Sequence, residues 1–284
     1  MKQITAFLDG SVYGESVCDH AAWAGDRLGL PVTLVHVLGR RTETSSAPAD
    51  LSGSLKLGAR SELLAKLARH DEERAALARE RGRALLGDAA ARTAARANVE
   101  VRTRLRHGDL IEAIGEIEDE TRFAIIGKRG EAADFASLHL GSNLDRAVRV
   151  ANRPVLVASR AFRPIERFLF AYDGSPSAER ALERLRAGSV LDGLDCHILM
   201  AGGAPDAAER LARAAARLRE AGLAVTEHVG QAQPEAAIAG AVKDLGIDLL
   251  VIGKSGHSRL RQLFIGSTTL ELMRSCTVPV LIFP

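Results

Sequence analysis

Two stretches of this chain carry an aspartate and a set of glycines in an arrangement that could hold phosphate groups. The second-half set consists of Asp173, Gly253, Gly256, Gly266, Ser267 and Thr268. Two residues separate Gly253 from Gly256, and nine more precede Gly266. Glycines let the backbone approach a ligand closely, and the free N–H groups of a helix that begins at Gly266 favour phosphate oxygens. Asp173 is placed to accept hydrogen bonds from ribose or adenine. The pattern therefore predicts a nucleotide site.

The first half carries a weaker copy of the same set, formed by Asp9, Gly127, Gly130, Gly141 and Ser142. Here ten residues, instead of nine, separate Gly130 from Gly141. The loop between them brings Glu131 and Asp134, whereas the second-half loop brings Arg259 and Arg261. A carboxylate beside a phosphate is repelled by about 1 kcal/mol per pair in a wet cleft. We therefore expect nucleotide to bind mainly in the second half.

The elements that must position these residues are repeated as well. The segment ITAFLDGS opens the first half and RFLFAYDGS opens the second, and each half closes on X-Pro-Val-Leu. Short apolar runs alternate with helical segments throughout, which predicts right-handed crossovers and a parallel sheet covered by helices on both faces. The predicted fold is α/β: two tandem, doubly wound, five-stranded parallel-sheet domains of order 3-2-1-4-5, packed about a pseudo-twofold axis. We place the domains at residues 1–160 and 166–284.

One part of the first half has no counterpart in the second. Residues 39–60 are rich in Ser, Thr, Gly and Ala, and predict a long surface loop. A long helix is expected from residue 61 to residue 96, with a break possible at Gly82 or Gly87. Residues 99–105 alternate apolar and polar side chains, which predicts a strand with one exposed face near a sheet edge.

Bulk composition excludes several classes of protein. The 284 residues are 46% apolar and 26% charged, with a formal net charge of +2. This balance is typical of a soluble globular protein and implies no nucleic-acid partner. No apolar stretch approaches the roughly 20 residues of a membrane span, and no signal peptide is apparent. Cys18, Cys196 and Cys276 lack ligand spacing, so we expect no metal site and a cytoplasmic location.

At this point the chain resembles the universal stress protein family in its tandem-domain form, across nearly all residues of both halves. The glycine spacing of the second half, the aspartate after the first strand and the closing V-P-V-L-I strand carry the resemblance. It implies a flavodoxin-like, adenine-nucleotide-alpha-hydrolase-like fold and an ATP-binding, cytoplasmic stress-response protein. It also implies a dimer that often pairs through the last strand, and ATP bound with or without Mg²⁺.

Other interpretations remain open. The same crevice could serve a weak ATPase or phosphotransferase, although the second-half loop offers neither a base nor a metal-binding carboxylate. A ligand-free interaction module, as a homodimer or with another protein, fits the first half best. The Gly253-Lys254-Ser255 run is not expected to form a P-loop, because six residues, instead of four, separate Gly246 from Gly253. We expect a binding protein more than an enzyme, with no catalytic residue assigned.

Overall fold

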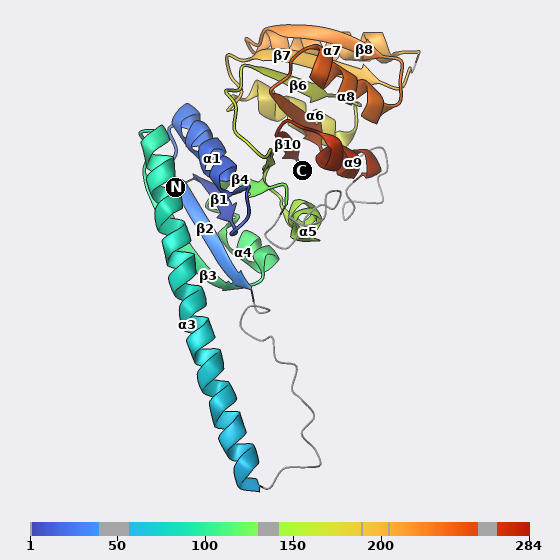
Figure 1. Cartoon of the computed structure of the whole chain (residues 1–284). Coiled ribbons are helices and arrows are strands. Elements are labelled where there is room, and N and C mark those ends of the chain that lie inside the picture. The colour runs from blue at the N-terminus through green and yellow to red at the C-terminus, as the bar shows by residue number, and fades with distance from the viewer. Residues whose placement is uncertain (1, 40–56, 130–141, 189, 204, 255–265) are drawn as a thin grey trace.

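The computed structural model describes residues 2–39, 57–129, 142–188, 190–203, 205–254 and 266–284 (Figure 1). The first half contains β1 (Gln3–Leu8), α1 (Gly14–Leu28), β2 (Val32–Gly39), α3 (Leu57–Arg96), β3 (Val101–Gly108), α4 (Leu110–Ile117), β4 (Thr121–Gly127), α5 (Ser142–Val150) and β5 (Val155–Ala158). The second contains β6 (Arg167–Ala171), α6 (Pro176–Arg186), β7 (Asp195–Ala201), α7 (Ala207–Glu220), β8 (Val225–Gly230), α8 (Pro234–Asp244), β9 (Leu249–Gly253), α9 (Ser267–Ser275) and β10 (Val280–Phe283).

The strands form one ten-stranded sheet of order β3-β2-β1-β4-β5-β10-β9-β6-β7-β8. Within each half the neighbouring strands are parallel and their order is 3-2-1-4-5, so the predicted fold is confirmed. The two halves join where β5 and β10 pair antiparallel, with Leu156 opposite Leu281. The last strand of each half therefore lies against the last strand of the other.

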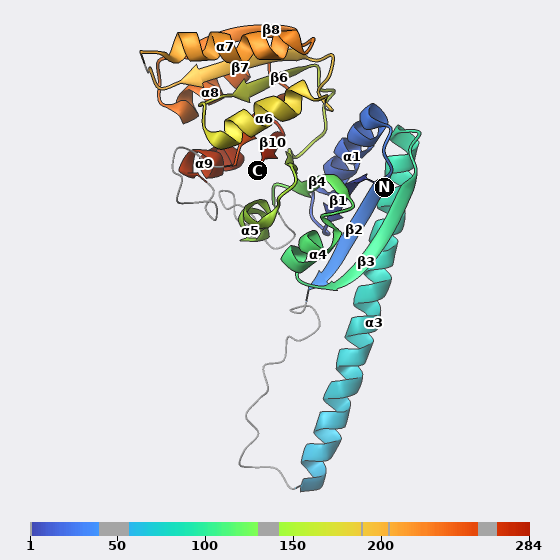
Figure 2. The ribbon, with the colours of Figure 1, turned by 180° about the vertical axis from the view of Figure 1, so that it is seen from behind.

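Two apolar cores lie on the two faces of this sheet. One contains buried residues of α1, α3, α6 and α7, and the other contains buried residues of α4, α5, α8 and α9 (Figures 1 and 2). The central strands are buried along their whole length, as β1, β5 and β10 illustrate. Continuous apolar runs with few polar residues are what a sheet covered on both faces requires.

Helix α3 is continuous and begins four residues earlier than predicted, so no break forms at Gly82 or Gly87. Gly82 instead allows close packing, because a Cβ there would lie 2.8 Å from Leu105 Cδ1. The end of α3 is fixed to α1 by Arg92, whose Nε and Nη2 donate to the buried Asp19 carboxylate at 2.8 and 2.9 Å. Figure 1 shows the beginning of α3 extending well beyond the sheet.

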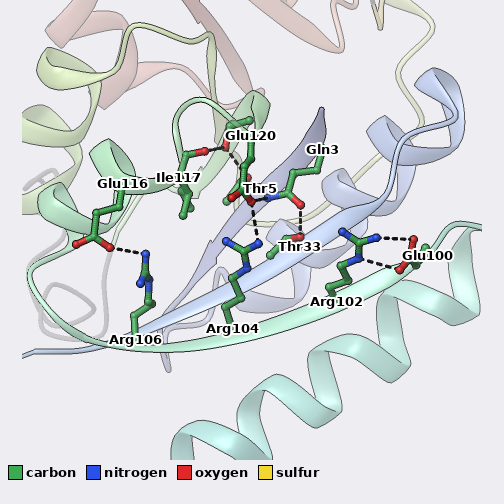
Figure 3. Close-up of polar contacts among 11 residues, drawn as sticks. Gln3, Thr5, Thr33, Glu100, Arg102, Arg104, Arg106, Glu116, Ile117 and Glu120 are labelled. Atoms are coloured by element: carbon green, nitrogen blue, oxygen red, sulfur yellow. Dashed lines mark hydrogen bonds and ion pairs between the residues drawn. The ribbon is translucent and has the colours of Figure 1, made fainter. Parts of the chain in front are cut away.

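The edge strand β3 is partly exposed, as its alternating pattern predicts. Its arginines Arg102, Arg104 and Arg106 pair with Glu100, Glu120 and Glu116 (Figure 3). Charged side chains along an edge oppose pairing with a further strand. Thr5 and Thr121 share a buried hydrogen bond of 2.8 Å, which ties β1 to the beginning of β4.

Two lysines connect the halves reciprocally. Lys128, which follows β4, donates from Nζ to the Cys276 carbonyl at the end of α9 at 2.8 Å. Lys254, which follows β9, donates to the carbonyls of Arg149 and Ala151 at the end of α5. Cations at a helix C-terminus satisfy carbonyls that have no partner within the helix. Each half therefore supplies the cation that caps a helix of the other, consistent with the pseudo-twofold axis.

Candidate functional site

The strand order reverses between β6 and β9 in the second half, so the carboxyl ends of these strands lie side by side at a place we call the crevice. Ligands of doubly wound sheets bind at such a position. Asp173 lies just after β6, and Gly253 is the last residue of β9. The fold therefore brings together two predicted site residues that are 80 positions apart in the sequence.

The turn after β6 is fixed by its own polar groups. The Ser175 backbone N–H donates to Asp173 Oδ1 at 2.9 Å, and Ser175 Oγ accepts from the Ala178 N–H as the N-cap of α6. Gly174 adopts φ +69°, a conformation that disfavours any side chain. This arrangement sets the carboxylate of Asp173 at the rim of the crevice.

Gly253 has no room for a side chain. A Cβ at this position would lie 2.6 Å from Ser177 Oγ and 2.9 Å from the Ala178 backbone nitrogen. The end of β9 therefore lies directly against the first turn of α6. Because Ser177 Oγ also lies 3.1 Å from Ser175 Oγ, the two loops are connected through this contact.

Helix α9 begins at Ser267 beside the end of β9. Thr269 Oγ1 donates to the Gly253 carbonyl at 3.3 Å, and Gly266 precedes the helix in an extended conformation without a capping side chain. Ser267 is exposed. The first N–H groups of a helix and its dipole attract anions. The N-terminus of α9, which no described side chain caps, therefore lies beside the crevice.

Two charged residues that the sequence did not single out also reach this site. Arg210 of α7 donates from Nη2 to the Asp173 carbonyl at 3.0 Å, and its guanidinium lies over Gly174. Glu235 of α8 accepts a 2.7 Å hydrogen bond from Thr268 Oγ1, and this hydrogen bond lowers the pKa of the carboxyl. Both side chains come from crossover helices with no spacing relation to the glycines, so no motif could have revealed them. We expected the Thr268 hydroxyl to contact phosphate, but in this structure it donates its hydrogen bond to Glu235.

The corresponding crevice of the first half differs from that of the second beside the turn after its first strand. Ser11 N–H donates to Asp9 Oδ1 at 3.1 Å, as Ser175 N–H does to Asp173, but α1 begins five residues after its aspartate, whereas α6 begins three residues after its own. Counted from the two aspartates, Tyr13 takes the place of Ser177. It is buried, and a Cβ at Gly127 would lie 2.9 Å from Tyr13 Cβ. An aromatic side chain therefore stands where the second half has a small hydroxyl.

Several predicted residues lie outside the described part of the chain. These are Gly130, Gly141 and Gly256, together with the charged loop residues Glu131, Asp134, Arg259 and Arg261. Ser142 begins α5, but its side chain is not described. Lys254 points away from the crevice to the end of α5, which agrees with setting the P-loop interpretation aside.

No described helix is long and apolar enough to span a membrane. The described residues also hold no group of three or more His, Cys, Asp or Glu side chains arranged to bind a metal ion.

The fold and its crevices define a duplicated α/β protein of the doubly wound class. The model of the universal stress protein family matches residues 1–159 and again residues 164–284. Universal stress protein Slr1230 of Synechocystis is 35% identical over 287 residues and covers 100% of both chains. The chain therefore belongs to the universal stress protein family, in a tandem-domain form.

Solved structures support the same fold over the whole chain. A universal stress protein from Archaeoglobus fulgidus aligns with a TM-score of 0.72 at 20% identity, covering 99% of this chain and 97% of that one. A putative universal stress protein from Pseudomonas aeruginosa aligns with a TM-score of 0.61 at 16% identity, covering 100% and 93%. Both likenesses concern the fold alone.

Proposed function

We propose that this protein binds ATP in the crevice of its second half and acts as a cytoplasmic regulatory protein of the stress response. The observation that carries the proposal is the convergence of Asp173, the side-chain-free Gly253 and the uncapped beginning of α9. Asp173 would accept hydrogen bonds from the nucleoside, and the backbone near Gly253 would pass close to the phosphates. The β- and γ-phosphates would lie at Gly266 and Ser267.

The charge of the crevice supports the same orientation. Arg210 places a cation above the turn that carries Asp173, while the dipole of α9 contributes partial positive charge at the other end. Among the described residues no donor reaches Asp173 Oδ2, which leaves that oxygen available to a ribose hydroxyl. The terminal phosphates would meet the N–H groups of α9.

An ATPase or phosphotransferase is the second candidate, and Glu235 is the observation that favours it. A carboxylate beside the phosphate end is the group needed to hold Mg²⁺. Thr268 Oγ1 now donates to this carboxylate, and binding of a metal would replace that hydrogen bond. If hydrolysis occurs, Glu235→Gln should abolish turnover while ATP still binds.

The first half is proposed as an interaction module, through which the protein forms a homodimer or meets another protein. Tyr13 fills the position of Ser177 beside Gly127, which narrows the space where a nucleotide would pass. The free cysteines, of which Cys18 and Cys196 are buried, are compatible with a reducing cytoplasm.

The duplication supplies a matched control for the test. Asp173→Ala should weaken ATP binding about 10- to 100-fold, because a hydrogen bond to a charged group contributes about 1.5–3 kcal/mol. Asp9→Ala, at the same position of the first half, should leave the affinity unchanged. Isothermal titration with ATP measures both, and mass spectrometry of nucleotide released from the denatured protein identifies the ligand. No ATP binding by the unaltered protein would refute the proposal, and equal losses in both variants would refute the assignment to the second half.

A further inference from the structure

A cavity that is separate from the crevice lies between the two halves. It has a volume of about 1160 Å³, and its lining comes from α1, β4 and α5 of the first half and from α6 and β10 of the second. Of the described crevice residues, neither Asp173 nor Gly253 lines it. Both halves therefore form its wall. We call it the interdomain cleft.

The first half contributes four cationic side chains to this cleft: Lys2, Arg122, Arg149 and Arg153. Arg149 is paired with Asp145 at 2.9 Å, whereas Arg153 reaches Asp119 only at 3.9 Å. The Nε of Arg153 is buried and has no hydrogen-bond partner among the described residues. Because this atom is buried, the terminal nitrogens of Arg153, whose side chain is 33% exposed, are the ones left to meet an anion in the cleft.

The second half contributes Arg180, Arg184 and Lys254. Arg180 Nε donates to the Pro284 carbonyl oxygen at 2.8 Å, and Lys254 caps α5. Arg122 of the first half and Arg184 pair with no carboxylate in the described part of the chain. Two guanidinium groups, one from each half, therefore remain to meet an external anion.

The two glutamates of the cleft do not cancel this charge. Glu179 and Glu183 line the cavity, but both accept from Arg217, at 2.8 Å in the case of Glu179. Glu183 also pairs with Arg186 at 3.1 Å. Neither arginine lines the cleft. Among the described residues the lining thus holds seven cationic and two anionic side chains, and although Arg149 and Arg153 have carboxylate partners of their own, the balance is positive.

Apart from Thr121 and Asn152, the remaining described lining is apolar and includes Leu28, Phe123, Val150, Leu281 and Phe283. Val150 is 44% exposed. Small-molecule sites combine an apolar wall with a few polar groups, in cavities of about 300–1,000 Å³. Guanidinium groups recognise phosphate oxygens through pairs of parallel hydrogen bonds. We propose that the interdomain cleft binds a small organic phosphate, with its phosphate at Arg122, Arg153 and Arg184 and its apolar body against the strand ends.

Titration calorimetry with 1-naphthyl phosphate tests this proposal, with inorganic phosphate as the reference ligand. The naphthyl compound should bind more tightly than inorganic phosphate, because only it can cover the apolar wall. Arg184→Gln should weaken binding about tenfold and the double variant Arg122→Gln/Arg184→Gln about a hundredfold, at one charge-assisted hydrogen bond per arginine. Arg213→Gln, which removes an exposed arginine of α7, should have no effect.

Ser267→Glu separates this site from the crevice. A carboxylate at the start of α9 repels phosphate there, so the variant should lose ATP yet bind 1-naphthyl phosphate as before. The proposal is overturned if the unaltered protein binds no naphthyl phosphate, if Ser267→Glu abolishes that binding, or if Arg184→Gln leaves it unchanged. Hexaglutamate serves as an acidic peptide for comparison. If it binds and naphthyl phosphate does not, the proposal is equally overturned. Circular dichroism verifies folding, and the exposed single variant Arg184→Gln suffices if the double variant does not fold.

Discussion

Lys254 offers a direct test of how the two halves are held together. The residue is only 9% exposed, and its ammonium group donates to the carbonyls of Arg149 and Ala151 across the junction. Lys254→Met keeps the length and apolar stem of the side chain but removes every donor. The two carbonyls at the end of α5 then lose a partner in a place where the helix dipole already concentrates negative charge.

The expected cost follows from two opposing contributions. Each charge-assisted hydrogen bond contributes about 1.5–3 kcal/mol. Burial lowers the pKa of Lys254, which Arg180 reinforces and Glu118 opposes, so the ammonium is itself unfavourably desolvated. Methionine avoids that desolvation and recovers part of the loss. We expect a net decrease in the free energy of unfolding of about 1–3 kcal/mol, which for a chain of this size lowers the Tm by roughly 2–6 °C.

Differential scanning calorimetry measures the change, and it also reports whether the halves unfold together. Lys243→Met is the matched control, because Lys243 is an exposed lysine near the end of α8. It should change the free energy of unfolding by less than about 1 kcal/mol. Lys128→Met removes the reciprocal contact with α9 and should behave as Lys254→Met does. Unchanged stability in both interdomain variants would show that water replaces the lysines and would refute the reasoning.

Two further perturbations test the crevice and the first core. Gly253→Ala places a Cβ 2.6 Å from Ser177 Oγ and 2.9 Å from a backbone nitrogen, so it should cost about 1–3 kcal/mol and weaken ATP binding. Gly240 lies within α8 with open space around it, so Gly240→Ala should instead stabilise the protein by up to about 1 kcal/mol. Chemical denaturation measures both variants, and equal stabilities would contradict this expectation. Burial lowers the pKa of His20 to about 4, although hydrogen bonding to Ser16 and the charge of Asp19 oppose the shift. The unfolded state then takes up a proton that the folded state resists, so stability is full above about pH 6.5 and falls by on the order of 3 kcal/mol towards pH 4. A His20→Asn variant should lack this part of the pH dependence, and an identical pH profile in both proteins would rule the explanation out.

Much of the fold follows from local patterns in the sequence. Apolar runs such as Ile4–Leu8 are strands because both faces are covered, and the repeat of aspartate, glycine and serine places each first turn. The order of strands follows from right-handed crossovers. The continuity of α3 does not follow, because the close contact of Gly82 with Leu105 depends on tertiary packing and not on helix propensity.

The site was predictable only in part, for a related reason. Asp173 and Gly253 belong to turns that a motif describes, and the structure brings their loops into contact. Arg210 and Glu235 reach the crevice from helices that follow neighbouring strands, which no spacing rule encodes. The glycine spacing argues against Lys254 as a P-loop lysine, but it does not reveal the acceptors of this side chain. These acceptors lie more than 100 positions earlier in the chain.

The pairing of β5 with β10 has a consequence for how the two halves can diverge. Because the partners are covalently joined, each meets the other at a high effective concentration, and dilution cannot separate them. In a dimer of identical subunits every substitution would appear twice, once in each crevice. Here one copy can acquire Tyr13 while the other retains Ser177. The duplication thus allows the two crevices to differ in function, because a half whose crevice no longer binds a ligand still completes the shared sheet.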